Sequence, residues 1–343
     1  MRYMIAFLAL LFAFPAQAQI VIAHRGASGE RPEHTLAAYE RAIDEGADFI
    51  EPDLVPTKDG VLVARHENEI GATTDVAAHR EFARRRKTVT VDGGSITGWF
   101  TEDFTLAELR TLRAREIMPL VRPGNARFDG LYSIPTFAEI VALVKAKEAE
   151  SGRRIGIYPE LKHPAYFARL GIDNTPALMN ALTAAGYTHA ADPVFVQCFE
   201  VAPLVALRPH THLRLIQLIA AHGGPPDRPG TTFAAMMTPA GLAEVARYAD
   251  GIGVEATALI GADGKATSVI ADAHAAGLQV HAWTLRRENR FLPAPLRIGT
   301  DPGAPGNFAA AWALLRAAGV DGVFTDNPGS VPGVRPGAVI HSH

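Results

Sequence analysis

The sequence contains a single cysteine, Cys198, among 343 residues. One cysteine cannot form a disulfide within the chain, which excludes the small secreted domains that depend on disulfide frameworks, so the hydrophobic core has to hold the fold. An excess of charge of one sign is also missing, because 33 Lys and Arg face 36 Asp and Glu. This balance gives no general attraction to nucleic acid or to anionic membranes, and binding of an anion would need a local site.

Long apolar runs are missing after the first 18 residues, so nothing later in the chain could cross a bilayer. At the start, an apolar run over residues 5–14 follows Arg2 and precedes the small residues 16–18. This layout is typical of a cleavable secretory signal, and the run is too short for a membrane anchor. We therefore expect residues 1–18 to be a signal peptide, and the mature protein to be exported, most simply to the periplasm, without a stable membrane anchor.

Nine short apolar, β-branched segments alternate with helical stretches along the rest of the chain, at residues 20–23, 48–54, 61–66, 154–161, 194–199, 213–219, 251–255, 278–283 and 320–325. This rhythm indicates a β/α fold. Residues 57–60, Thr-Lys-Asp-Gly, are a hairpin turn signal, so segment 61–66 should pair back on segment 48–54. The remaining eight predict a TIM-type (β/α)8 barrel over residues 19–331, with a hairpin after the second strand. An open doubly wound sheet would instead carry a glycine-rich loop after its first strand.

A polar stretch at residues 67–133 shows little strand alternation and predicts one insertion near the mouth of the barrel. Within it, Thr105 and Glu108 form the start signal of a helix that we expect over residues 105–115. The basic run at residues 84–87 suits a solvated surface better than an anion site, although both remain open. Residues 332–343 are expected to be a loose tail.

Three carboxylates lie at the ends of predicted strands, on the side of the barrel where active sites assemble. Glu51 and Asp53 are two residues apart in an extended strand and therefore point to the same side. Glu160 ends the next barrel strand and would add a third oxygen ligand. A set of carboxylates suits a hard ion, so we expect one divalent cation, with Ca²⁺ favoured and Mg²⁺ possible, although each residue alone could form an ordinary salt bridge.

The other polar residues at these strand ends suit phosphate chemistry. His24 and His66 could deprotonate a nucleophile and protonate a leaving alkoxide. Arg25 and Lys162 could neutralise charge on a phosphoryl transition state. Trp283, at the end of the seventh barrel strand, could pack against an apolar part of a substrate or could be an ordinary packing residue.

Several of these residues belong to motifs that lie in the same order in a known family. The motifs are Ala-His-Arg-Gly-Ala-Ser-Gly at 23–29, Pro-Glu-His-Thr at 32–35, Gly-Ala-Asp-Phe-Ile-Glu-Pro-Asp at 46–53, Pro-Glu-Leu-Lys at 159–162, Trp-Thr at 283–284 and Asp-Gly-Val-Phe-Thr-Asp at 321–326. The sequence thereby resembles the glycerophosphodiester phosphodiesterase family. Its signal-like start and large insertion are most similar to the periplasmic branch.

The resemblance implies a TIM barrel that hydrolyses glycerophosphodiesters, such as glycerophosphocholine and glycerophosphoethanolamine, to sn-glycerol 3-phosphate and an alcohol. It implies a metal at Glu51, Asp53 and Glu160, acid and base roles for His24 and His66, and phosphate binding by Arg25 and Lys162. The insertion would cover the glycerol end. The sequence departs from the usual family pattern at Glu67, where aspartate is usual, and at His34, where asparagine is usual although the periplasmic branch shares the histidine.

Two other functions compete with this interpretation. A related phospholipase D-like phosphodiesterase would act on intact lipid, but it would need apolar membrane-facing loops, and none is evident. An exported binding protein could capture phosphodiesters without cleaving them. Such a protein would need neither paired histidines nor a carboxylate set for a metal, so the sequence favours turnover of a small-molecule substrate.

Overall fold

The computed structural model describes residues 19–261 and 264–335. The expected signal peptide and the last eight residues of the expected tail lie outside the described residues. Within the described part of the chain, no helix is both long enough and apolar enough to span a membrane.

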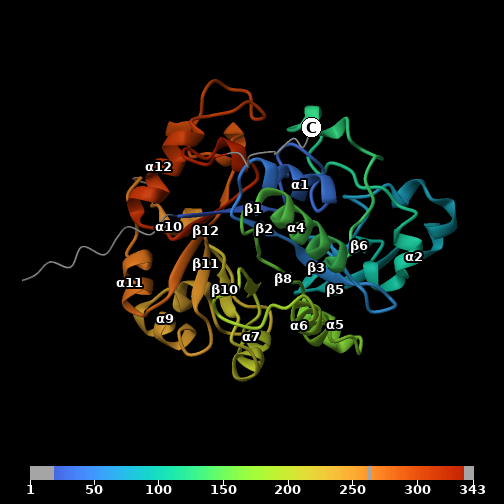
Figure 1. Cartoon of the computed structure of the whole chain (residues 1–343), viewed down its shortest axis with the longest axis horizontal. Helices are drawn as coiled ribbons and strands as arrows, with labels where there is room; N and C mark the ends of the chain where they lie inside the picture. Colours follow the sequence, from blue (N-terminus) through green and yellow to red (C-terminus); the bar gives the residue numbers. More distant parts are fainter. Residues whose placement is uncertain (1–18, 262–263, 336–343) are drawn as a thin grey trace, which may run out of the picture.

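The fold is a TIM-type barrel, as predicted, with helices outside a ring of parallel strands (Figure 1). Strand β1 pairs in parallel with β2 on one side and with β13, the last strand, on the other, which closes the ring. The barrel strands are β1 (Ile20–His24), β2 (Phe49–Glu51), β3 (Asp53–Pro56), β7 (Gly156–Ile157), β8 (Glu160–Leu161), β9 (Phe195–Cys198), β10 (Arg214–Ile219), β11 (Gly251–Glu255), β12 (Gln279–Leu285) and β13 (Gly322–Thr325).

Two of the predicted strands are each divided in two by a break that contains a proline. Pro52 separates β2 from β3, and Pro159 lies between β7 and β8. Proline has no N–H to donate to a neighbouring strand, so it interrupts the ladder. Each half then pairs separately: β2 with β7, and β3 with β8. The predicted hairpin is present, because β4 (Leu62–Ala64) runs antiparallel to β3.

The helices that cover the barrel begin where the sequence supplies capping side chains. Thr35 of the Pro-Glu-His-Thr motif caps α1 (Leu36–Asp44), and Thr136 with Glu139 forms a capping box at α4 (Phe137–Ser151). The remaining outer helices are α5 (Pro164–Arg169), α6 (Asn174–Ala184), α7 (Val201–Leu207), α8 (Phe233–Met236), α9 (Pro239–Val245), α10 (Ala256–Leu259), α11 (Val269–Ala275) and α12 (Phe308–Ala318).

The barrel interior is filled by large side chains. Phe49, Tyr158, Phe195 and Phe324 pack there, and each is at most 8% exposed. The rings of Tyr158 and Phe195 stack with centroids 4.8 Å apart. The polar groups at the carboxyl ends of the strands therefore stand above a packed apolar floor, as is usual for this fold.

The insertion contains more strand than the sequence suggested. Strands β5 (Lys87–Val91) and β6 (Gly94–Gly98) form an antiparallel hairpin that lies on the same side of the barrel as α2 (Leu106–Leu109) (Figure 1). The helix expected over 105–115 is wrong in length: α2 is Leu106–Leu109, although Thr105 and Glu108 do form the predicted capping box. Beyond the helix, Ala114 pairs with Thr74 in an isolated antiparallel bridge. A second short helix, α3 (Pro123–Ala126), follows.

The basic run at residues 84–87 is engaged within the insertion. Arg85 pairs with Glu108 at 2.5 Å, and Lys87 lies 2.8 Å from Asp103. Because these cations already face carboxylates, the surface interpretation describes them better than an anion-binding one.

Candidate active site

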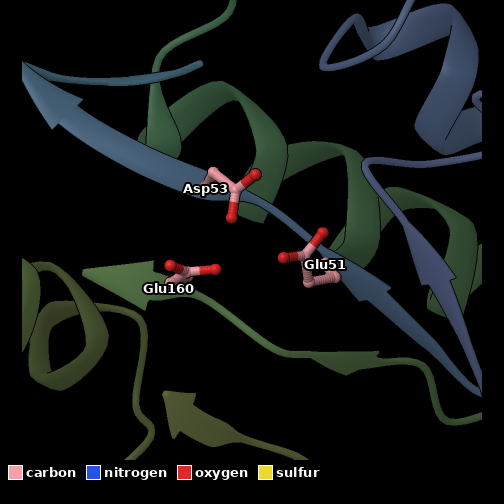
Figure 2. A group of neighbouring side chains, drawn as sticks. All are labelled: Glu51, Asp53 and Glu160. Carbon is pink, nitrogen blue, oxygen red and sulfur yellow. The ribbon is translucent and has the colours of Figure 1, made fainter. Parts of the chain in front are cut away.

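The three predicted metal-ligand carboxylates converge at the mouth of the barrel. Glu51 and Asp53 point from the strand broken by Pro52 toward Glu160 on the neighbouring strand (Figure 2). The register of β3 against β8 sets Asp53 directly opposite Glu160. All three side chains are buried, and one oxygen from each lies within 4.8 Å of the others. The structure thus brings together residues that are more than 100 positions apart in the sequence.

The electrostatics of this triad fit a bound cation. Burial and the neighbouring Asp53 raise the pKa of Glu51 well above its usual range, and burial raises the pKa of Glu160 to about 8. Within the described structure, the buried Oδ1 atom of Asp53 has no hydrogen-bond partner. Crowded carboxylates repel unless a cation or shared protons compensate them. Three oxygen donors, one of which has only the Lys162 ammonium group as a partner, at 3.8 Å, suit a hard divalent ion.

Neighbouring side chains fix the orientation of these carboxylates. His34, the residue that departs from the family pattern, places Nε2 2.9 Å from Oδ2 of Asp53. Gln197 on β9 donates to Oε1 of Glu51 at 3.0 Å, and the backbone N–H of Arg25 donates to Oε2 at 2.8 Å. Supporting hydrogen bonds of this kind orient metal ligands. The sequence did not reveal Gln197, because nothing in its local pattern distinguishes it from any other strand residue.

His24 is held by a carboxylate from the far end of the chain. Its Nδ1 atom lies 2.7 Å from Oδ1 of Asp326, which directly follows β13. The other oxygen of Asp326 accepts from Arg122 at 2.6 Å and from Arg286 at 2.8 Å. Burial opposes ionisation of Asp326, but Arg286 and Arg122 hold its pKa well below the usual range. Asp326 ends the motif at residues 321–326, and its position just after a strand is the signal in the sequence that points to it.

His66 has a corresponding arrangement. Its Nδ1 atom lies 2.9 Å from Oε1 of Glu67, the second departure from the family pattern. The other oxygen of Glu67 lies 3.0 Å from Nε2 of His163, whose Nδ1 is 2.7 Å from Asp92 at the tip of the β5–β6 hairpin. Glutamate therefore orients His66 here, and its longer side chain also reaches His163.

Both histidines keep one nitrogen available. Within the described residues, no hydrogen bond involves Nε2 of His24 or of His66. Burial and then Arg25 lower the pKa of His24 to about 3, and burial, Arg25 and Lys162 lower that of His66 to about 4. Both rings are therefore neutral near pH 7 in the protein alone, and each presents Nε2 for proton transfer.

The two predicted phosphate-binding cations lie beside the triad. Arg25 is 2.9 Å from Glu33 and 3.5 Å from Asp53, and Lys162 is 2.7 Å from Glu160. Arg25 and Lys162 therefore concentrate positive charge where the three carboxylates meet. An anionic phosphate can be attracted there and can exchange some of these contacts.

Trp283 contacts the cluster only indirectly, through Phe199, and also makes a structural contact. Its indole N–H donates to the carbonyl of Gly253 at 2.9 Å, and its ring meets Phe199 edge to face at 5.8 Å between centroids. Lys162 in turn lies 5.8 Å from the centroid of Phe199. Trp283 is thus joined through Phe199 to the predicted phosphate-binding side.

A TIM barrel whose mouth holds a carboxylate triad, two histidines and two cations has the fold and site of a phosphoric diester hydrolase, and comparison with known proteins agrees. Residues 24–330 match the model of the glycerophosphoryl diester phosphodiesterase family. The chain belongs to that family, which confirms the resemblance drawn from the sequence motifs.

Named relatives cover nearly the whole chain. It is 36% identical to a glycerophosphodiester phosphodiesterase of Arabidopsis thaliana, over 90% of this chain and 84% of the relative. It is 30% identical to one of Haemophilus influenzae, over 90% of this chain and 88% of the relative. In fold it resembles an Oleispira antarctica phosphodiesterase solved with sn-glycerol 3-phosphate, with a TM-score of 0.59 and 20% identity over 92% of this chain and 95% of the other. A glycerophosphodiester phosphodiesterase of Agrobacterium tumefaciens gives a TM-score of 0.56 at 20% identity, over 91% and 98% of the two chains.

Proposed function

We propose that this protein hydrolyses small glycerophosphodiesters, such as glycerophosphocholine and glycerophosphoethanolamine, to sn-glycerol 3-phosphate and an alcohol, in a reaction that depends on one divalent cation. The observation that carries the proposal is the buried carboxylate triad beside two histidines, each with Nδ1 on its own carboxylate. The Oleispira antarctica neighbour, which was solved with sn-glycerol 3-phosphate, supports the choice of product.

Glu51, Asp53 and Glu160 would hold the cation, with Ca²⁺ favoured and Mg²⁺ possible. When bound, such an ion supplies Lewis-acid stabilisation of negative charge on the phosphoryl oxygens. The buried Oδ1 atom of Asp53, which lacks a hydrogen-bond partner in the described structure, supports this role for the triad. So does the absence of nitrogen and sulfur ligands among the three, which favours a hard ion.

His24 and His66 would exchange protons with the reacting groups. In each ring, Nδ1–H donated to the carboxylate leaves Nε2 as the basic atom, the same logic by which a carboxylate fixes a histidine tautomer in hydrolases. One Nε2 takes a proton from the attacking oxygen, of water or of the substrate's own glycerol hydroxyl, as that oxygen bonds to phosphorus. The other ring, protonated, gives its proton to the alkoxide as the P–O bond to the alcohol breaks. If the glycerol hydroxyl attacks, water then opens the cyclic phosphate with the two histidine roles reversed, which gives the same product. The negative charge of the bound substrate favours protonation of that second ring and offsets the effect of the nearby Arg25.

Arg25 and Lys162 would bind the phosphate, and Trp283 would pack against an apolar part of the substrate. Both cations are held within hydrogen-bonding or ion-pair distance of triad carboxylates, so they need little rearrangement to meet a phosphate there. Pre-positioned charge of this kind stabilises a transition state without reorganisation at the moment of reaction.

The same proposal includes export. Residues 1–18 would be a cleaved signal peptide, 19–331 the phosphodiesterase barrel with 67–133 as its insertion, and 332–343 a tail. The support is the charged, apolar and small-residue order at the start of the chain, which is that of a secretory signal. A periplasmic or other extracytoplasmic location follows from it.

Release of glycerol 3-phosphate from glycerophosphocholine by the protein beginning at Gln19 tests the proposal. We expect EDTA to abolish release, Ca²⁺ or Mg²⁺ to restore it, and Glu51→Gln to remove it under all conditions. The folded protein failing to release glycerol 3-phosphate with either ion would overturn the proposal. Turnover of intact phospholipid, or binding of the diester without turnover, would then assign the chain to one of the competing functions.

A further inference from the structure

A cavity of about 130 Å³ opens beside the proposed phosphate site, on the side of β8, β9 and the loop after β10. It shares Glu160 and Lys162 with that site, and its further lining includes His163, Phe199, Glu200 and Phe233. None of these last four has a role in the proposed proton transfers. Because the cavity begins at Lys162, a group bound in it would be attached close to a phosphate held there.

The cavity has an aromatic wall. The rings of Phe199 and Phe233 lie 6.1 Å apart and are tilted by 59° to each other. Phe199 also meets Trp283 edge to face, so the wall continues toward the mouth of the barrel. Aromatic faces carry partial negative charge and attract ammonium groups, and they do so most strongly where water is excluded.

The cavity also has a carboxylate without a cationic partner. Glu200 is 2% exposed, and both of its oxygens accept from the backbone N–H of Ala165, at 3.1 and 2.9 Å. Among the residues that the structure describes, no lysine, arginine or histidine forms a salt bridge with Glu200. A buried carboxylate is costly unless a cation accompanies it.

The two cations that line the cavity are already matched by other carboxylates. Lys162 lies 2.7 Å from Glu160, and His163 lies 3.0 Å from Glu67 and 2.7 Å from Asp92. Glu200 is therefore the acid of the lining that no cation matches. Burial raises its pKa to about 7, and an ammonium group bound beside it would favour the ionised form. A carboxylate and aromatic rings that line the same cavity are a combination that recognises a cation with an apolar surface.

We propose that this cavity is the head-group subsite, and that it selects glycerophosphodiesters whose alcohol ends in an ammonium group, quaternary or primary. The inference rests on the proposed function and adds the class of substrate that the site prefers. Choline and ethanolamine carry their nitrogen two carbons from the phosphate ester oxygen, which matches a cavity that begins at Lys162. A neutral head group such as glycerol would gain nothing from Glu200 or from the aromatic wall.

Three substrates that release the same product provide the test: glycerophosphocholine, glycerophosphoethanolamine and glycerophosphoglycerol. For each we would measure kcat/KM of glycerol 3-phosphate release by the full mature protein with its metal. We expect the two cationic substrates to be preferred, and Glu200→Gln to lower their kcat/KM about tenfold, as loss of one buried contact to an ammonium group implies. The value for glycerophosphoglycerol should stay within about twofold.

Two further variants complete the design. Phe233→Leu keeps an apolar wall but removes the aromatic face, and it should lower kcat/KM chiefly for glycerophosphocholine. Glu255→Gln is the matched control, because Glu255 also lies at the end of a strand and accepts a backbone N–H, from Ala221, yet it does not line the cavity. It should leave the ratio between the substrates unchanged.

One further measurement uses the unaltered protein, so its result does not depend on whether a variant folds. Tetramethylammonium should inhibit hydrolysis of glycerophosphoglycerol competitively in the unaltered protein. The head-group assignment would be overturned if Glu200→Gln lowered kcat/KM equally for all three substrates or for none of them. It would also be overturned if tetramethylammonium did not inhibit. In each of these cases the hydrolase function would stand. No release from any substrate by the unaltered protein would overturn the proposed function itself, and the head-group assignment with it.

Discussion

The Nδ1 atom of His24 lies 2.7 Å from Oδ1 of Asp326, although the two residues are 302 positions apart. Parallel pairing of β1 with β13 closes the barrel and sets the carboxyl ends of these two strands side by side. Arg122 of the insertion then contacts the second oxygen of Asp326. The orientation of one histidine therefore depends on the first strand, the last strand and the insertion together.

Asp326 is expected to be a positioning residue for His24. In Asp326→Asn, the amide no longer favours the Nδ1–H tautomer, so kcat should fall by roughly 10²-fold or more while KM changes little. The pH profile of kcat should shift as well, which a purely structural role would not produce. Asp321→Asn is the control, since Asp321 precedes the same strand at the opposite end of the barrel. Equal losses in both variants would contradict the prediction.

Arg122 should matter for stability as well as for activity. Its side chain is buried and contacts both Glu288, at 2.5 Å, and Asp326, at 2.6 Å. Removing one partner of a buried ion pair strands the other charge, so Arg122→Ala should lower the free energy of unfolding by roughly 3 kcal/mol or more. Urea denaturation would measure this loss, with the exposed Arg127→Ala as the control. A change below about 1 kcal/mol would show that the ion pairs contribute little.

Binding of the divalent ion should stabilise the fold independently of turnover. The three buried carboxylates repel one another without a cation, so added Ca²⁺ or Mg²⁺ should raise the melting temperature of the unaltered protein. At a concentration 100 times the dissociation constant, the gain is about 2.7 kcal/mol. Asp53→Asn should reduce the response, because it removes one ligand charge from the triad. An equal shift in both proteins would place the ion elsewhere.

His163 should make stability depend on pH above neutrality. Burial opposes its protonation, but contacts with Asp92 and Glu67 raise its pKa from 6.5 to about 9. A group whose pKa is higher in the folded than in the unfolded protein stabilises the folded state. This stabilisation is complete at pH values below the unfolded pKa, and it is lost as the pH rises through the folded pKa. Stability should therefore fall by on the order of 3 kcal/mol between about pH 6.5 and 9.

Chemical denaturation across this pH range would measure the effect. Glutamine keeps hydrogen-bonding capacity but cannot titrate, so His163→Gln should be less stable at pH 6.5 and should show a flatter dependence up to pH 9. Parallel curves for the two proteins would mean that another group causes the loss.

Two variants of Glu67 separate the effect of its side-chain charge on His66 from the effect of its side-chain length. Glu67→Gln keeps the reach of the side chain but removes the charge that fixes the His66 tautomer, so kcat should fall by roughly tenfold to 100-fold. Glu67→Asp, the residue usual in the family, keeps the charge and should retain more activity. If the two variants behave alike, the carboxylate does not orient His66 electrostatically.

The sequence alone determined the barrel, the hairpin after its second strand and the carboxylate triad. These features depend on local patterns: alternation of apolar segments, a turn signal at residues 57–60, and the two-residue spacing of Glu51 and Asp53 on one strand. The TIM topology then fixes which end of every strand faces the mouth, so residues that follow strands in the sequence meet in space.

Only the tertiary structure decided which partners those residues have. Asp326, Gln197 and Arg122 reach the site from the end of β13, from β9 and from the insertion, and the cavity beside Lys162 is lined by residues from four separate parts of the chain. Neither the β5–β6 hairpin nor the early end of α2 was visible in the sequence. Periodicity and spacing describe how a segment folds, whereas the partner of a buried charge depends on which segments the closed barrel brings together.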